Sequence, residues 1–218
     1  MTLNLSKTID WNAKRGEFAR EDFSLTLIDN LLTEDSAEML HLMLHTLPGW
    51  HQPDWGKDWF DLSSGYQQLI NPKLVGLPSF CKSVIAAMGW PDELTLKGLF
   101  AVRCNGNSGL LPHADNADFI LNLWTTPDRF NRQIGSGGMT VWNVKAPTTA
   151  APEEFTNAEW VQSYLNSQSH ARKMQIPYQF NRAILFDAKL FHTSQPIDFE
   201  GIFPKSMRTN LTFAFALR

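Results

Sequence analysis

Two histidines and one aspartate are spaced so that a folded chain could bring them to one metal ion. His113 and Asp115 are separated by a single residue, and residues i and i+2 of an extended segment point to the same side. His192 comes much later, a few residues after the apolar run Ala183–Phe186. Two imidazoles and one carboxylate form the facial triad that holds Fe(II) and leaves the opposite coordination positions open. If these three residues share one metal ion, the chain must fold so that the segment around His113 meets the segment around His192.

Each of these residues also has a simpler interpretation. The segment 108–116 contains Gly, Pro and Asn, so His113 and Asp115 could belong to a polar surface turn. His192 could be a structural histidine held by hydrogen bonds. We expect it just past the end of a strand, in a tight loop that ends at Pro196. The metal-site hypothesis rests on the order and spacing of the three residues together.

The run Arg208–Phe215 near the C-terminus alternates as a strand with two different faces. The apolar face, which can pack on a core, carries Thr209, Leu211, Phe213 and Phe215. The other face, which is polar at one end and small at the other, carries Arg208, Asn210, Thr212 and Ala214. That face suits the interior of a barrel that binds a ligand, with the planar guanidinium of Arg208 directed to a carboxylate. The simpler interpretation is a surface arginine at the start of a strand.

The order His-x-Asp, His, Arg resembles the Fe(II)/2-oxoglutarate-dependent oxygenases, over about Leu94 to the C-terminus. The resemblance implies that His113, Asp115 and His192 bind Fe(II) and that Arg208 anchors the distal carboxylate of 2-oxoglutarate. It also implies that O2 is consumed, with succinate and CO2 as coproducts. Such enzymes hydroxylate by default, but the same residues also serve desaturation, ring closure and demethylation. Because Asp115 is present, the resemblance argues against the halogenases, which replace this carboxylate.

Within that family, the wording Arg-x-Asn-Leu-Thr-Phe is closest to the DNA-alkylation-repair dioxygenases. This similarity implies Asn210 as a second contact to 2-oxoglutarate. Those enzymes have another arginine where Ala214 stands here, so binding of the cosubstrate must be completed differently. A further departure is Arg103, which replaces a tyrosine common among the relatives. Arg103 could approach the cosubstrate or line the outside of the barrel, and we expect the latter.

The resemblance implies a mainly β fold with flanking helices around a double-stranded β-helix core, of jelly-roll or cupin-like type. We expect a single oxygenase domain over residues 1–218, with 1–93 as helical support and 94–218 as the core. Periodicity alone predicts only a strand-rich C-terminal half. We expect helices at 34–46 (capped by Thr33), 79–88 and 153–166. We expect strands at 23–28, 94–104, 119–124, 139–142, 183–186 and 209–217.

Three other segments could contribute to a site. Gly135–Gly138 resembles the Gly-Gly lead-in to a middle strand of these oxygenases, although any glycine turn before a strand would look the same. Trp50–Phe60 has three Trp and two Asp in a stretch rich in breakers, which predicts a loop. This loop could cover the site and grip a cationic group, or its rings could pack back onto the barrel. The insertion 146–168 could cover the site or lie far from it.

Composition limits the class of partner and the compartment. The net charge is −3 with a pI near 6.1, and no basic run exceeds two residues, which argues against a nucleic-acid partner. Cys81 and Cys104 are isolated, so we expect neither a zinc site nor a disulfide, and instead buried thiols in a cytoplasmic protein. The sequence shows no signal-peptide core and no apolar stretch long enough to span a bilayer. Nothing in the sequence indicates the oligomeric state.

For the substrate, we expect a small polar molecule such as an amino acid or its derivative, since the chain is compact and has no basic face. A peptidyl substrate and a methylated nucleic acid remain alternatives within the family. Outside it, the chain could be a cupin-like metal-dependent isomerase or hydrolase that needs neither O2 nor 2-oxoglutarate. It could also be a non-catalytic barrel that binds a small ligand or a partner through the Trp50–Phe60 surface. Oxygen consumption that depends on 2-oxoglutarate separates these alternatives from the main hypothesis.

Overall fold

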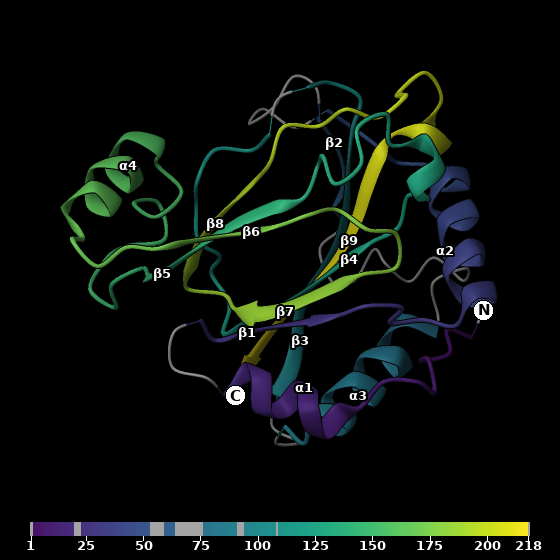
Figure 1. Ribbon diagram of the computed structural model, residues 1–218, viewed down its shortest axis with the longest axis horizontal. Helices are drawn as coiled ribbons and strands as arrows, with labels where there is room; N and C mark the ends of the chain where they lie inside the picture. Colours follow the sequence, from purple (N-terminus) through teal and green to yellow (C-terminus); the bar gives the residue numbers. More distant parts are fainter. Residues whose placement is uncertain are drawn as a thin grey trace.

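The computed structural model describes residues 2–19, 23–52, 59–63, 76–90, 94–107 and 109–217, with the backbone alone at 59–63 and at Pro78. The described residues form two antiparallel sheets and the helices that flank them (Figure 1). Within this part of the chain, no helix has both the length and the apolar character needed to cross a membrane.

The large sheet has six strands in the order β1-β7-β4-β9-β3-β2. Their bounds are β1 Leu25–Ile28, β7 Ala183–Asp187, β4 Phe119–Trp124, β9 Arg208–Leu217, β3 Leu94–Cys104 and β2 Trp59–Ser63. Every neighbouring pair is antiparallel. The edge strands β1 and β2 come from the first 93 residues, so the N-terminal part of the chain adds strands to this sheet as well as helices.

The small sheet has the order β6-β5-β8, with bounds Lys173–Ile176, Met139–Lys145 and Leu190–Ser194. A β-bridge between His113 and His192 adds the segment around His113 alongside β8. The chain passes from the large sheet to the small one after β4, returns at β7, crosses again at β8 and ends in β9. Apolar side chains of both sheets, such as Ile120 and Val141, form one core cluster between them. This mainly β architecture is the expected double-stranded β-helix.

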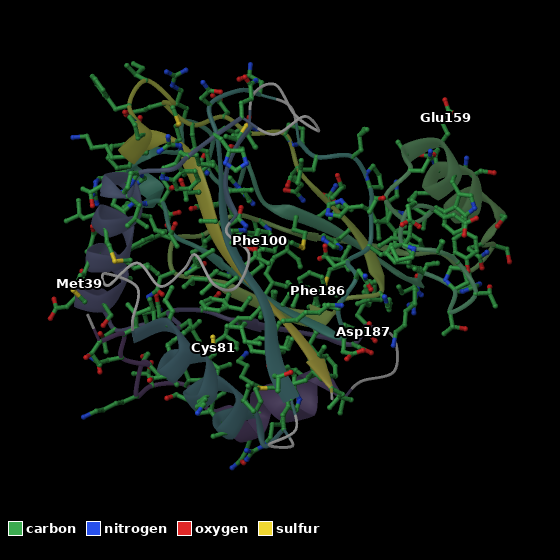
Figure 2. All side chains as sticks on the ribbon, turned by 180° about the vertical axis from the view of Figure 1, so that it is seen from behind. Met39, Cys81, Phe100, Glu159, Phe186 and Asp187 are labelled. Atoms are coloured by element: carbon green, nitrogen blue, oxygen red, sulfur yellow. The ribbon has the colours of Figure 1, made fainter. Side chains whose placement is uncertain are left out.

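Helices cover the outer face of the large sheet (Figure 1). They are α1 Trp11–Phe18, α2 Glu34–Thr46 and α3 Gly76–Met88. A second core cluster joins Leu40 of α2 and Val84 of α3 to Leu211 and Phe213 of β9. The helix α4 (Ala158–Ser167) stands apart from these helices at the end of the small sheet, and Glu159 lies on it in Figure 2. Two short 3-10 helices, η2 Asp128–Phe130 and η3 Pro204–Ser206, lie in the connections.

The predicted elements agree with the structure where an apolar pattern was long. The helix 34–46 and the strands 94–104 and 119–124 have the expected bounds, and Thr33 occupies the N-cap position of α2, although its side chain makes no capping hydrogen bond. The helix expected at 153–166 begins later, at Ala158, because the side chain of Asn157 caps it.

Two predictions of loops were wrong. His192 lies inside strand β8, where its segment pairs with β5, and is not in a loop past a strand. Trp59 and Phe60 belong to β2, so the predicted loop ends before them, and residues 53–58 of that loop lie outside the described residues.

Candidate metal centre

The structure brings His113, Asp115 and His192 together at one edge of the small sheet. Backbone hydrogen bonds join His113 and His192 in both directions, at 3.0 and 2.8 Å, and the amide of Asp115 donates to the carbonyl of Ala188 at 2.8 Å. One ligand atom from each of the three side chains lies within 4.8 Å of the other two. The His-x-Asp segment is thus held along β8, and residues separated by most of the C-terminal half share one site.

Backbone carbonyls orient both imidazoles. The Nδ1 of His113 lies 2.8 Å from the carbonyl oxygen of Leu111, and the Nδ1 of His192 lies 2.9 Å from that of Leu190. A carbonyl oxygen can only accept, so each Nδ1 carries a proton, and Nε2 is the nitrogen of each ring through which a metal could be bound. The Nε2 of His192 is 3.5 Å from the Oδ2 of Asp115. Orientation of a ligating imidazole through its other nitrogen is what metal sites require.

Burial keeps His192 in the form that can bind a metal. Its side chain is enclosed, and burial lowers its pKa to about 4, with the nearby His113 as the second cause. The ring of Phe186 meets it edge-on at 4.9 Å between centroids and holds it in place. Two imidazole nitrogens and a carboxylate oxygen, gathered within 4.8 Å of one another, are the donor set that suits Fe(II) with open positions. The residues present therefore fit that metal.

Arg208 lies inside the barrel at the start of β9 and is 2% exposed. Its Nε donates to the carbonyl of Gly137 at 3.0 Å, and one of its terminal nitrogens donates to the Oδ1 of Asn210. The Nδ2 of Asn210 donates in turn to the hydroxyl of Thr212 at 3.0 Å. The opposite face of β9 packs against the helices, as the alternation predicted. Burial lowers the pKa of the guanidinium, but an arginine keeps its proton, so the interior holds a desolvated positive charge.

The glycines before β5 let the backbone approach this arginine. Gly135 and Gly137 have φ values of 83° and 73°, a region that favours glycine. A Cβ on Gly137 would lie 3.3 Å from the Cγ of Arg208 and 3.1 Å from the ring of Phe199. The Gly-rich lead-in to the strand therefore also shapes the site.

Arg103 and Trp50 lie on the helical side of the large sheet. Val102 and Cys104 belong to the interior cluster, so Arg103 between them faces outward, where its guanidinium carbon is 4.2 Å from the centroid of the Trp50 ring. The indole of Trp50 donates to the carbonyl of Leu44 in α2 at 3.1 Å. Arg103 is thus outside the barrel as expected, and Trp50 packs back onto the protein.

The insertion 146–168 touches the outer side of the His-x-Asp segment. The carbonyl of Phe155 accepts from the amide of Ala114 at 3.0 Å. The ammonium of Lys189 lies 4.8 Å from the centroid of the Phe155 ring and donates to the carbonyl of Asp115 at 3.3 Å. The insertion therefore supports the segment that carries two of the three candidate ligands.

Strand β4 contributes two interior polar side chains that the sequence analysis did not single out. Asn122 and Trp124 alternate with Leu121 and Leu123, which pack on the helical side. The available signal was the single amide in an otherwise apolar run, Phe119–Trp124.

Comparison with known proteins gives matches in structure but not in sequence. No family model matches the chain, and no curated protein matches it. Solved structures match over nearly all of it. The fold is that of the 2OG-Fe(II) oxygenases. At these identities the likeness establishes the fold alone.

Three of these structures illustrate the range of the fold. An oxidoreductase of the 2OG-Fe(II) oxygenase family from Burkholderia pseudomallei is 9% identical with a TM-score of 0.59, covering 100% of this chain and 96% of its own. A prolyl hydroxylase from Trichoplax adhaerens, in complex with a hypoxia inducible factor peptide, is 14% identical with a TM-score of 0.60. The match covers 95% of this chain and 89% of the Trichoplax chain. HygX from Streptomyces hygroscopicus, with nickel, 2-oxoglutarate and hygromycin B bound, is 12% identical with a TM-score of 0.62. The match covers 97% of this chain and 87% of the HygX chain.

Proposed function

We propose that this protein is an Fe(II)- and 2-oxoglutarate-dependent oxygenase. The observation that carries the proposal is the meeting of His113, Asp115 and His192, in a barrel whose interior also holds the buried Arg208. The three candidate ligands alone, or the buried arginine alone, could be explained by a purely structural role. A facial donor set together with a desolvated guanidinium matches a metal that is chelated by a dicarboxylate.

The three side chains have separate tasks in this proposal. The Nε2 atoms of His113 and His192 and a carboxylate oxygen of Asp115 would hold Fe(II), with the backbone carbonyls of Leu111 and Leu190 fixing the imidazoles. Iron with 2-oxoglutarate bound supplies the activation of O2, with succinate and CO2 as coproducts. Burial keeps the imidazole of His192 neutral, and the fold gathers the three ligand atoms within 4.8 Å of one another.

Arg208 would bind the distal carboxylate of 2-oxoglutarate. Its guanidinium is desolvated, so a charge-assisted hydrogen bond there is stronger than at the surface. Asn210 was expected to contact the cosubstrate itself. Its Oδ1 accepts from Arg208 and its Nδ2 donates to Thr212, so we propose that Asn210 positions the arginine instead.

For the substrate, we propose a small polar molecule such as an amino acid or its derivative. The net charge of −3 disfavours a nucleic acid, and HygX, which shares the fold, is seen with the small molecule hygromycin B. A peptidyl substrate is the second candidate, because the Trichoplax enzyme of this fold is seen with a peptide. We also propose a cytoplasmic location, because Cys81 and Cys104 are both buried as thiols and are not joined in a disulfide.

The decisive test is anaerobic. Fe(II) and then 2-oxoglutarate are added to metal-free protein while the visible spectrum is recorded. We expect a weak metal-to-ligand charge-transfer band that is absent in His192→Ala and that requires more 2-oxoglutarate in Arg208→Ala. Arg129→Ala is the matched control, because Arg129 forms an exposed ion pair with Glu38. If no band appears at saturating iron and cosubstrate, the oxygenase proposal is wrong, and a cupin-like metal enzyme or a non-catalytic barrel takes its place.

A further inference from the structure

Two buried polar side-chain atoms lie on the interior face of β4. Among the described residues, neither the indole Nε1 of Trp124 nor the Oδ1 of Asn122 has a hydrogen-bond partner. Trp124 is 0% exposed, and its ring belongs to the cluster between the sheets. A buried N–H without an acceptor is destabilising, so an acceptor inside the barrel would bind favourably to it.

These atoms lie along the path from the candidate metal centre to Arg208. The ring of His192 meets Phe186, which is paired with Ile120 of β4. Asn122 is the next interior residue of β4 and is paired with Thr212 of β9. Trp124 follows and is paired with Asn210, which holds the guanidinium of Arg208. The indole is therefore at the arginine end of the path, and the amide of Asn122 is in its middle.

The indole ring has a fixed position. It stacks on the ring of Tyr178, with 4.9 Å between centroids and 18° between planes. The hydroxyl of Tyr178 donates to the carbonyl of Thr126 at 2.8 Å and accepts from its amide at 3.0 Å. The guanidinium carbon of Arg208 lies 5.9 Å from the centroid of the Trp124 ring and equally far from that of Tyr178. A rigid N–H beside a desolvated cation is a combination that binds a carboxylate.

We propose that the indole N–H of Trp124 donates a hydrogen bond to the distal carboxylate of 2-oxoglutarate beside Arg208. This inference rests on the proposed function and adds a residue to it. Asn122 is not assigned to the carboxylate, because its unpartnered atom is an acceptor and cannot donate to one.

Binding of two 2-oxo acids to the anaerobic Fe(II) protein tests the proposal. The probes are 2-oxoglutarate and 2-oxopentanoate, which has the same chain length but no distal carboxylate. Trp124→Phe removes the N–H and keeps an aromatic ring on Tyr178. Since a hydrogen bond to a charged group contributes about 1.5–3 kcal/mol, we expect about 10- to 100-fold weaker binding of 2-oxoglutarate, measured by calorimetry. Binding of 2-oxopentanoate should change by less than about twofold, because its contacts do not involve the N–H.

Trp90→Phe is the matched control, because Trp90 stacks on Phe119 on the helical side of the large sheet, away from the barrel interior. It should leave the binding of both acids unchanged. An equal loss for both acids in Trp124→Phe would mean that the ring acts by packing, and no loss would mean that the N–H is not used. Either result overturns the proposal.

A second readout uses the unmodified protein and does not depend on how the variant folds. With Zn(II) in place of iron, we expect one of the eight indole N–H resonances to move downfield with 2-oxoglutarate and to stay with 2-oxopentanoate. If none moves while calorimetry shows that 2-oxoglutarate binds, the inference about Trp124 fails and the proposed function stands. If the unmodified protein binds no 2-oxoglutarate, both fail together.

Discussion

Gly137 sets how closely the backbone approaches Arg208, and replacing it tests the geometry of that contact. In Gly137→Ala, the added Cβ would press on the Cγ of Arg208, and the φ of 73° would be strained by about 1–2 kcal/mol. We expect about 10-fold weaker binding of 2-oxoglutarate with unchanged binding of Fe(II), because a misplacement costing about 1.4 kcal/mol is a factor of ten. Titration of the charge-transfer band measures both.

The control is Gly16→Ala in α1. No atom lies within 4 Å of a Cβ added there, and alanine is more stable than glycine in a helix by about 0.5–1 kcal/mol. This variant should bind 2-oxoglutarate normally and unfold at a slightly higher temperature. Unchanged affinity in Gly137→Ala would show that Arg208 can move without loss and that its present position is not the binding position.

Residues with distinctive chemistry were the ones that the sequence could single out as candidates. His113, Asp115, His192 and Arg208 are recognisable because few other side chains bind metal or carboxylate so well, and the structure does bring the first three together. Trp124 has no such mark in the sequence. Most tryptophans are apolar core. The surroundings that leave this N–H without a hydrogen-bond partner among the described residues include strand β9 and Tyr178, which no local pattern reports.

At the scale of elements, the strands and helices that were missed lack the local signals of their type. Strand β8 follows β7 after a turn of only two residues, Ala188 and Lys189, neither of which is Gly, Asn or Pro. The turn exists because the chain crosses there from one sheet to the other, which is a tertiary cause. Helix α1 buries no residue completely, so its apolar stripe is weak, and the side chain of Asp10, which caps it, was its best signal.

Helix α2 carries a histidine pair, with His41 buried and His45 half-buried, that should make the fold sensitive to acid. The Nε2 of His45 lies 3.0 Å from the Nδ1 of His41. Burial lowers the pKa of His41 to about 4 and that of His45 to about 3. For His41, Glu38 opposes the shift while Arg129 and Lys205 add to it; for His45, His41 and Arg103 add to it.

The sign of the effect follows from these shifts. The unfolded chain takes up protons below about pH 6.5, whereas the folded pair stays neutral until about pH 4. The free energy of unfolding should therefore fall as the pH drops through this window. Urea unfolding at pH 7 and pH 5 measures the fall. His45→Gln keeps an N–H for His41 and should reduce the fall, and His170→Gln, on the surface, should not. Equal falls in the free energy of unfolding in the unmodified protein and in both variants would show that the histidine pair does not cause the sensitivity to acid.

Strand β9 links the site to the helical layer through its apolar face. Phe213 is 0% exposed, and its ring lies 5.7 Å from that of Phe80 in α3. Phe213→Ala would leave a cavity between sheet and helices, so we expect a loss of about 3–5 kcal/mol in the free energy of unfolding, measured by urea denaturation. Leu217→Ala, at the end of the same strand where the side chain is 51% exposed, should lose far less. Similar losses would mean that β9 does not anchor the helices.

At the scale of the whole molecule, the fold could be expected only through the resemblance. Periodicity predicted a strand-rich C-terminal half but not which strands share a sheet. The pairing of β1 with β7 joins Leu25 to Phe186, and no local pattern specifies a partner so distant. The same long-range closure places His192 beside His113. The candidate metal centre is therefore assembled only when the barrel is closed.

This dependence predicts that ligands stabilise the entire fold. His113 and Asp115 lie on one segment and His192 on another, so the unfolded chain lacks the site and binding favours the folded state alone. Fe(II) and 2-oxoglutarate at about 100 times their dissociation constants should add about 2.7 kcal/mol for each independent ligand. For a chain of this size, one such contribution should raise the Tm by about 5–11 °C in an anaerobic melting experiment.

Asp115→Asn, which keeps the shape but loses the charge on one candidate ligand, should abolish most of this rise. Glu159→Gln, on the protruding α4, should keep it (Figure 2). A full rise in Asp115→Asn would show that the metal binds elsewhere.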